Sequence, residues 1–567
     1  MKGFGILFLF AAFVTVSYGQ GGGYNRELPV NHVWVDSVYN SMTPEMRIAQ
    51  LIWPMVEQLG DPNRQKVLLE MINRYQPGGI LVMKNKAEPI VSFINKAQRR
   101  SNVPMLTAID AEWGLAMRVE GVVPYPRAMV LGAITNDTLL YRTGMGMARQ
   151  LREMGISVSF GPVADVNNNP ANPVIGVRSF GENANRVARS SVWLMHGLQD
   201  GGVMAVAKHF PGHGDTHTDS HLALPIIDHS RQRFDSLELV PFAALIKNGV
   251  YGVMTAHLEV PGLEPLAGLP SSLSRKIVTD LLKIQMGFSG LVVTDAMNMK
   301  GVKKAGQPGR VDALALAAGN DVVESSENIA LAINEIKKSI TGGEMSWSDI
   351  ELKCRKVLAM KYLLGLTDWL VTDSVDVLQR LNGAMDEKLL QQLADASLTT
   401  LSWGTDTNLV KAQDSLVILV MPHQKEWRQM VTGCLNAKIV ELSPSMTAAQ
   451  TIKLRNDLKR FGRIIWWMDN SAPSRGIWNL PVMADLRNDK NINARLVVFY
   501  GGMPYGLSKI SGLKDVVNLV LCYEDTVYAR TAVVRFLDGR IFSKGKLPVS
   551  IPLFKEGTGM EVGYGLY

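Results

Sequence analysis

The stretch VMAVAKHFPGHGDTHTDSH, residues 203–221, sets the expected fold of the chain. Its first five residues are apolar on both faces, as in a strand that is buried within a parallel sheet. Pro211, Gly212 and Gly214 then exclude a regular helix, so we expect the strand to open into a polar loop. In α/β proteins, catalytic groups gather where strands end in loops at the carboxyl edge of the sheet. The stretch therefore predicts a strand that leads into an active-site loop.

Short apolar runs of the same kind recur along the first part of the chain. They lie at 80–83, 105–109, 157–160, 203–207, 252–255, 291–294 and 321–323, and the segment 48–56 supplies an eighth. Stretches of helical length lie between them, among them 137–154, 183–200 and 273–286. Repeated strand–helix units over roughly 300 residues predict a (β/α)8 TIM-type barrel, an α/β fold. An open doubly wound sheet is the alternative, but no GxGxxG fingerprint opens the first unit.

A second series of strands and helices is expected beyond the barrel. Residues 345–366 predict an amphipathic helix that closes the first domain, which we place at 20–370. Residues 371–386 are expected to form a linker, and 387–567 a second α/β domain. The strands expected in that domain lie at 416–421, 463–468, 494–500 and 516–522.

The composition is that of a large globular protein, with 567 residues of which 47% are hydrophobic and 20% charged. A chain of this length is expected to divide into at least two domains. The formal net charge of +7 is spread without a run of basic residues, so no nucleic-acid partner is expected. Cys354, Cys434 and Cys522 are scattered and odd in number, which predicts buried apolar residues and no disulfide framework.

The first nineteen residues decide the compartment. Lys2 precedes an apolar run over residues 4–16, and Ser17 and Gly19 are the small residues before a cut at Gln20. We therefore predict a signal peptide over residues 1–19 and a secreted or periplasmic protein. No other segment reaches about eighteen unbroken apolar residues, so no membrane span is expected.

Four histidines follow the central strand at intervals of four: His209, His213, His217 and His221. On a helix this interval would form a metal-binding stripe, but the proline and glycines remove the helix. Asp219 and His221 are two residues apart, so in an extended segment their side chains point to the same side. Asp219 would then hold one imidazole nitrogen and stabilise the imidazolium. The alternative is a histidine-rich loop that satisfies its own hydrogen bonds.

Acidic residues follow three of the expected strands. They are Asp110, Asp165 and Asp295. Each one alone is explained equally well as a helix N-cap. Several acids that converge on one barrel face beside the histidine loop would instead form a carboxylate-lined pocket, of the kind that grips sugar hydroxyls or stabilises an oxocarbenium ion.

Four motifs resemble those of glycoside hydrolase family 3, in its β-N-acetylglucosaminidase branch, and they occur in the order of that family. The motifs are DAEWGLAMR at 110–118, VIGVRSFGE at 174–182, KHFPGHGDTHTDSH at 208–221 and VVTDAMNMKG at 292–301. The resemblance implies a barrel followed by an α/β sandwich domain, whose closing motif is similar to GKLPVSIP at 545–552. One departure is Trp113, which replaces the first glycine of the family's DxEGG.

Residue by residue, the resemblance implies Asp295 as the nucleophile and His221, oriented by Asp219, as the general acid and base. The substrate-binding positions of the family fall on Asp110, Arg118, Arg178, Lys208 and His209. Both catalytic groups then lie in the barrel, so the second domain is expected to have a structural or substrate-framing role. No metal or organic cofactor is needed.

The implied function is that of a secreted, retaining exo-β-N-acetylglucosaminidase acting on oligosaccharides or muropeptides from peptidoglycan turnover. An imidazolium acid tolerates an anionic leaving group, which fits fragments that contain muramic acid. Three alternatives stay open: a β-glucosidase or xylosidase of the same family, a phosphorolytic N-acetylglucosaminidase, and a carbohydrate-binding protein without turnover. The sequence gives no indication of the oligomeric state.

Overall fold

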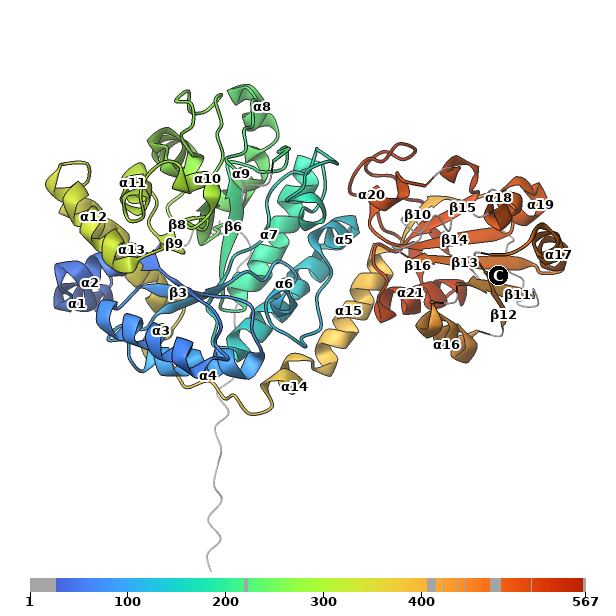
Figure 1. Cartoon of the computed structure of the whole chain (residues 1–567), viewed down its shortest axis with the longest axis horizontal. Coiled ribbons are helices and arrows are strands. Elements are labelled where there is room, and N and C mark those ends of the chain that lie inside the picture. The colour runs from blue at the N-terminus through green and yellow to red at the C-terminus, as the bar shows by residue number, and fades with distance from the viewer. Residues whose placement is uncertain are drawn as a thin grey trace, which may run out of the picture.

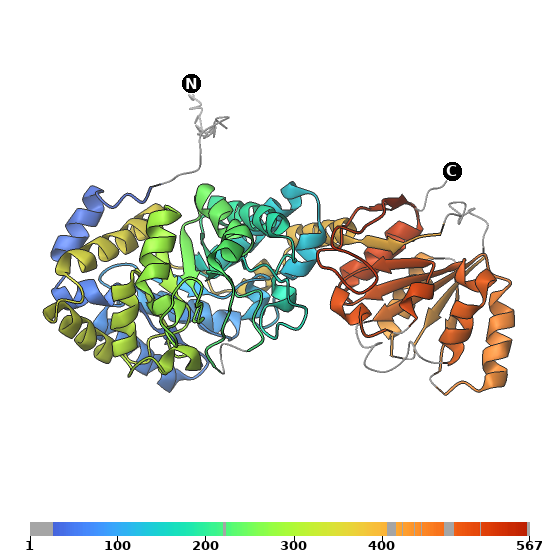
Figure 2. The ribbon, with the colours of Figure 1, turned by 90° about the horizontal axis from the view of Figure 1, so that it is seen from above.

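The computed structural model describes residues 27–563 except for 219–222, 405–414, 422, 436, 444, 470–480 and 511. The chain forms two lobes that lie side by side along its longest axis (Figures 1 and 2). The expected signal peptide at residues 1–19 lies outside the described residues, as do Asp219 and His221 of the expected acid/base pair.

In the described part of the chain, the first lobe is a closed barrel of parallel strands that follow one another in chain order. The strands are β2 (Met55–Val56), β3 (Gly79–Val82), β4 (Leu106–Ile109), β5 (Val158–Ser159), β6 (Met204–Phe210), β7 (Gly252–Thr255) and β8 (Leu291–Thr294). The ring closes through β9 (Val323–Glu324), which pairs with β1 (Ile52–Trp53) directly ahead of β2, and through a bridge between Val293 and Val322. The predicted (β/α)8 barrel is confirmed.

The barrel strands are apolar and buried because helices cover the ring on the outside. The strands β3, β4, β7 and β8 are buried along their whole length, as parallel strands with two covered faces must be. The central strand runs further than predicted, since β6 continues through Lys208 and His209 to Phe210. These two polar residues therefore lie on the strand itself, and the loop begins at Pro211.

Helices surround the barrel (Figure 1). They are α1 (Val33–Ser41), α2 (Pro44–Ala49), α3 (Pro62–Tyr75), α4 (Ala87–Gln98), α5 (Ala128–Ala133), α6 (Asp137–Glu153), α7 (Ala184–Asp200), α8 (Arg231–Ser236), α9 (Leu239–Lys247), the π-helix η4 (Lys276–Gln285), α10 (Lys300–Lys303), α11 (Arg310–Ala318), α12 (Ile329–Thr341) and α13 (Trp347–Leu363). The predicted helices at 137–154 and 183–200 are α6 and α7. Each begins after an asparagine, Asn136 or Asn183, whose side chain accepts N–H groups of the first turn.

The second lobe is an α/β sandwich whose sheet, in the described residues, has the order β10-β15-β14-β13-β11-β12. The strands are β10 (Thr399–Ser402), β11 (Leu416–Val420), β12 (Ala437–Glu441), β13 (Arg463–Asp469), β14 (Leu496–Gly501) and β15 (Asn518–Leu521). All but β10 are parallel, and they follow the 2-1-3-4-5 order of a doubly wound sheet. The helices α17 (Ala448–Leu458) and α18 (Pro481–Asn488) pack on one face, and α16 (Lys425–Cys434) and α21 (Val527–Leu537) on the other.

The segment between the lobes, residues 371–386, is partly helical and is bound to the barrel. It contains α14 (Val377–Leu381) and the start of α15 (Ala384–Ser397). Within it, Asp386 Oδ1 accepts a hydrogen bond of 2.8 Å from the hydroxyl of Tyr125. The expected linker therefore belongs to the packed surface of the barrel.

A second connection holds the sandwich against the carboxyl end of the barrel. Glu182 accepts hydrogen bonds from the hydroxyl and the backbone N–H of Ser550, at 2.5 and 2.8 Å. Asn167 Nδ2 donates to the hydroxyl of Tyr505 at 2.7 Å. Because Asn167 and Glu182 bracket the loop after β5, both ends of that loop are tied to the second lobe.

Two further expectations concern membranes and cysteines. Among the described residues, no helix is long and apolar enough to cross a bilayer. Cys354 and Cys522 are buried free thiols, as predicted. The side chain of Cys434 lies outside the described part of the structure.

Candidate active site

A pocket of about 720 Å³ lies over the carboxyl ends of the barrel strands. It is lined by residues at the ends of β4, β6, β8 and β9 and by the loops that follow β4 and β5. Of the predicted site residues, the pocket brings together Asp110, Arg118, Arg178, Lys208, His209 and Asp295. Charged groups from distant parts of the sequence therefore meet in one cavity.

A larger groove of about 970 Å³ lies at the opposite end of the barrel, beside residues 364–373. Gly155 and Gly202 in its wall precede β5 and β6, which places the groove at the amino ends of the strands. In TIM barrels the active site forms at the carboxyl ends. The smaller pocket is therefore the candidate active site.

Five charged side chains form a continuous network along the wall of this pocket. Lys208 Nζ lies 2.8 Å from Asp110 Oδ1 and 2.9 Å from Glu112 Oε1. Arg118 donates to Asp110 at 2.6 Å, and Arg178 donates to both oxygens of Glu112 at 2.7 and 2.8 Å. Burial raises the pKa of both carboxyls, but the neighbouring cations outweigh it and hold each pKa below its usual range. Glu112 is thus ionised and cannot serve as a general acid.

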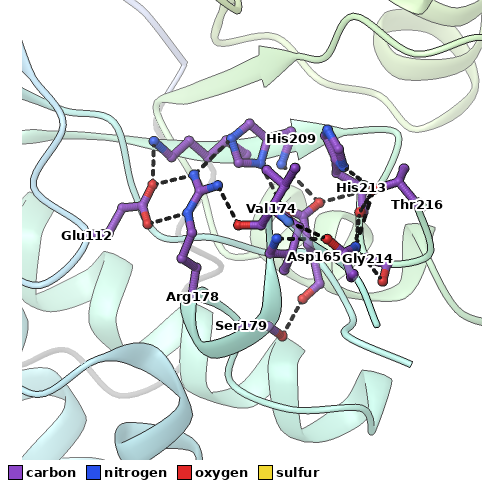
Figure 3. A network of polar contacts seen from close by, with 12 residues as sticks. Glu112, Asp165, Val174, Arg178, Ser179, His209, His213, Gly214 and Thr216 are labelled. Carbon is purple, nitrogen blue, oxygen red and sulfur yellow. Dashed lines mark hydrogen bonds and ion pairs between the residues drawn. The ribbon is translucent and has the colours of Figure 1, made fainter. Parts of the chain in front are cut away.

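Asp165 is hydrogen-bonded to both His209 and His213 (Figure 3). Its Oδ2 lies 2.7 Å from His209 Nδ1, and its Oδ1 accepts the N–H of His213 at 2.7 Å. The expectation that Asp165 lines a pocket with Asp110 and Asp295 is wrong, because Asp165 is fully buried. The chain after β5 runs beside β6, where Val163 forms a bridge with Lys208, and this turns Asp165 inward. No three His, Cys, Asp or Glu residues in the described chain are grouped to hold a metal ion.

Arg178 joins the two halves of the site. Its guanidinium lies between Glu112 and His209, whose Nε2 is 3.4 Å from Arg178 NH2 (Figure 3). Arg178 belongs to the loop after β5, the loop that the second lobe holds at Glu182. The position of this cation is therefore set by both lobes.

Asp295 differs from the other acids of the pocket. It follows β8 directly, and its Oδ1 accepts the backbone N–H of Ala296 at 2.8 Å. Within the described residues its carboxylate forms no ion pair, and its Oδ2 has no hydrogen-bond partner. Burial raises the pKa of Asp295. His209, His257 and the Ala296 N–H lower it by a larger amount, so the net shift is downward. Asp295 is an ionised carboxylate with a free oxygen, as a nucleophile requires.

Asp219 and His221 lie outside the described residues, so their placement stays a prediction. The chain that leads to them is anchored at the pocket. Asn172 Nδ2 donates to the carbonyl oxygens of His213 and Gly214 at 2.9 Å each. The loop that carries the expected pair therefore starts beside the candidate site.

Sequence reasoning missed part of the pocket wall. Glu324 lines the pocket at the end of β9, but the predicted strand ended one residue earlier, so its position at a strand end went unnoticed. In the sequence Trp113 stands out only as a departure from the DxEGG motif. Its ring lies 4.4 Å beneath the guanidinium of Arg127, and both side chains line the pocket. An aromatic residue in a strand-end motif was the available signal.

Comparison with known sequences places these features in a family. Residues 43–360 match the family model described as "Glycosyl hydrolase family 3 N terminal domain". "Beta-hexosaminidase A" of Pseudoalteromonas piscicida is 36% identical over 279 residues, which cover 45% of this chain and 46% of that protein. "Beta-N-acetylglucosaminidase/beta-glucosidase" of Cellulomonas fimi is 27% identical over 341 residues, covering 59% of this chain and 60% of that protein. The chain thus matches less than two thirds of the length of either relative.

Comparison with solved structures extends the similarity to both lobes. A glycoside hydrolase family 3 β-N-acetylglucosaminidase from Paenibacillus sp. str. FPU-7 superposes with a TM-score of 0.71 and 28% sequence identity. The match covers 91% of this chain and 99% of that structure.

Proposed function

Since the chain belongs to glycoside hydrolase family 3, we propose that it is a retaining exo-β-N-acetylglucosaminidase that releases terminal β-linked N-acetylglucosamine. The observation that carries the proposal is Asp295, an unpaired carboxylate in a pocket where Asp110 and Glu112 are held in ion pairs with Lys208. Relatives named β-hexosaminidase and β-N-acetylglucosaminidase support the choice of sugar.

The proposed reaction has two steps. Asp295 attacks the anomeric carbon, and His221 donates a proton to the departing oxygen, which leaves a glycosyl ester on Asp295. Water then attacks the ester, with His221 as the base, so that the released sugar keeps its configuration. Asp219 would hold the imidazole in the required tautomer and stabilise its charged form.

The ion-pair network is the proposed binding surface for the sugar. The carboxylates of Asp110 and Glu112 accept hydrogen bonds from hydroxyls, while Lys208, Arg118 and Arg178 donate them. Because these groups already hold one another in place, little ordering is needed when the sugar binds. His209, fixed by Asp165, completes the wall.

The proposed enzyme is secreted or periplasmic, on the strength of the signal-peptide pattern at residues 1–19. Its proposed substrates are peptidoglycan fragments or related glycans. A cationic acid at the leaving group would accept an aglycone that carries a carboxylate without repulsion between like charges.

The first experiment compares the nitrophenyl glycosides of N-acetylglucosamine, glucose and xylose. We expect turnover of the N-acetylglucosaminide, with the β-anomer as the first product in an NMR time course. Preferential turnover of the glucoside or xyloside would contradict the proposed sugar, and an α-anomer would contradict retention. Product analysis with and without phosphate separates hydrolysis from phosphorolysis, because only phosphorolysis yields a sugar 1-phosphate.

The second experiment tests the acid/base pair. His221→Ala is expected to slow substrates with poor leaving groups about 10²–10⁴-fold, and nitrophenyl glycosides far less, because nitrophenolate departs without a proton. Asp219→Asn is expected to act in the same direction more mildly, since it keeps the shape of the loop. Equal losses for both classes of leaving group would show that His221 only binds the sugar.

A further inference from the structure

Glu324 is an acid of the pocket to which the proposed mechanism gives no role. It ends β9, and its backbone N–H donates to the side chain of Thr294, the last residue of β8, at 3.0 Å. Asp295 is the next residue along that neighbouring strand. The side chain of Glu324 lines the pocket, yet the residue is only 2% exposed. Its carboxyl group is therefore held in the wall close to the proposed nucleophile.

The partners of Glu324 leave one of its oxygens free. Oε1 accepts a hydrogen bond from the hydroxyl of Ser325. In the described residues Oε2 has no partner, and no cation lies within ion-pair distance of the carboxyl. Ser325 has a φ of 53°, a left-handed conformation that a residue with a side chain rarely adopts. Such strain is retained where the surrounding structure enforces it, and it clusters at functional sites.

Burial and the charges around the pocket both raise the pKa of Glu324. Burial is the main cause, and the negative charges of Asp295 at the end of β8 and of Asp110 at the end of β4 act in the same direction. The hydrogen bond from Ser325 and the charge of Lys208 on β6 oppose them more weakly. The pKa of Glu324 is consequently raised well above its usual range. The pKa values of the two carboxyls in this pocket are therefore shifted in opposite directions, a separation that commonly assigns two roles to two acids.

We propose that Glu324 acts as a protonated carboxylic acid whose Oε2–H donates a hydrogen bond to an oxygen of the sugar bound at Asp295. This inference rests on the proposed hydrolysis and adds a substrate-binding residue to it. The neighbouring carboxylates of Asp295 and Asp110 are ionised and can only accept hydrogen bonds. A protonated Glu324 beside them can donate one to the sugar. A protonated group does this without placing a second negative charge beside the nucleophile.

The test compares Glu324→Gln with Glu324→Ala. Glutamine has nearly the same shape and keeps a neutral donor at every pH, whereas alanine removes the group. We expect Glu324→Ala to lower kcat/KM about tenfold, mainly through KM, and Glu324→Gln to restore it to within about threefold of the wild type. Activity is measured with a nitrophenyl N-acetylglucosaminide, because its departure does not depend on the proton of His221.

The pH profile is the decisive readout. In the wild type kcat/KM should fall as the pH rises through the pKa of Glu324, whereas the Glu324→Gln variant should lack this fall. Infrared difference spectra should also show a protonated carboxyl band at neutral pH that the glutamine variant lacks.

Two results would overturn the proposal. Loss of activity in Glu324→Gln, as severe as in Glu324→Ala or worse, would mean that an ionised carboxylate is needed. Identical pH profiles for the wild type and Glu324→Gln would mean that Glu324 only supports the wall. Failure of the proposed hydrolysis would be seen separately, as a wild-type enzyme that releases no N-acetylglucosamine.

Discussion

The barrel holds buried ion networks at both ends, and they are built from the same chemical groups. At the carboxyl end, Lys208 lies between Asp110 and Glu112 in the wall of a pocket. At the amino end, Asp321 lies among three lysines of the surrounding helices, Lys283, Lys353 and Lys356, at 2.8, 4.0 and 3.1 Å. Burial raises the pKa of Asp321, but the lysines hold it far below its usual range.

The difference between the networks lies in what surrounds them. The second oxygen of Asp321 also accepts the N–H of Val292, and Lys353 donates to the carbonyl of Asn320, so this network is satisfied by the protein itself. The network around Lys208 faces a cavity and stands beside Asp295, which has no cation of its own. Burial and ion pairing therefore do not mark an active site on their own. The candidate active site is distinguished by an open cavity and by the unpaired carboxylate of Asp295.

The largest expected effect is the loss of activity in Asp295→Ala. The substitution removes the proposed nucleophile, so we expect kcat to fall about a thousandfold or more. Because no ion pair in the described residues is broken, the free energy of unfolding should be unchanged or slightly higher. Steady-state kinetics and urea unfolding measure the two quantities. A variant that keeps a tenth of the turnover would show that another group is the nucleophile.

The matched substitution at the amino end, Asp321→Ala, should show the opposite pattern. It leaves buried lysines without their counter-charge, which is expected to cost about 3–5 kcal/mol of unfolding free energy. The kcat/KM of the folded fraction should stay close to that of the wild type. Glu344→Ala is the control, since its ion pair with Arg310 is exposed and should contribute less than about 1 kcal/mol. A large loss of kcat/KM in Asp321→Ala would contradict the view that the network at the amino end of the barrel serves only stability.

Lys208→Met should combine both effects on a smaller scale. It removes charge-assisted hydrogen bonds, each contributing about 1.5–3 kcal/mol, so we expect kcat/KM to fall about ten- to a hundredfold. It also leaves Asp110 and Glu112 facing each other without the cation between them, so stability should fall as well. Unfolding and kinetics on the same preparation separate the two losses. An unchanged KM would show that the network does not bind the sugar.

The smallest effect is a change in the pH dependence of stability. Lys361 is fully buried on α13, where its Nζ donates to Gln50 Oε1 at 2.5 Å. Burial lowers its pKa from 10.5 to about 7, so between these values the unfolded chain binds more protons than the folded one. Stability should therefore rise with pH across this window. Lys361→Met should reduce that slope, while Lys338→Met, an exposed control on α12, should leave it unchanged.

Part of the slope will remain in Lys361→Met. Lys353 is also buried, and its pKa is likewise lowered to about 7 by burial and by Lys283. A slope that Lys361→Met leaves unchanged would show that Lys361 keeps its charge in the fold.

The barrel strands could be predicted from the sequence because buried parallel strands are short apolar runs. The ranges 252–255 and 291–294 coincide with β7 and β8. The strands β10 and β12 were missed for physical reasons. The strand β10 reads TTLS and has little apolar character, and β12 is an edge strand that stays partly exposed and therefore lacks a continuous apolar run.

The site residues were predictable as strand-end positions and motif matches, but their pairing was not. Lys208 and Asp110 are 98 positions apart in the sequence, and only closure of the barrel brings them within 2.8 Å. The inward turn of Asp165 depends on the backbone path beside β6, which no local pattern encodes. Glu324 was missed because the predicted strand ended at residue 323, and its raised pKa comes from burial and from the charges of Asp295 and Asp110 on other strands, which no local pattern encodes.

The hold of Ser550 on Glu182 affects how long the enzyme would survive heating. The loop that ends at Glu182 also carries Arg178, so detachment of the sandwich lobe would release a wall of the pocket while the barrel is still folded. The rate of inactivation at elevated temperature would then be set by dissociation of the sandwich lobe from the barrel, and not by unfolding of the barrel. The working lifetime of the barrel would be set by a domain to which the proposed mechanism assigns no catalytic group.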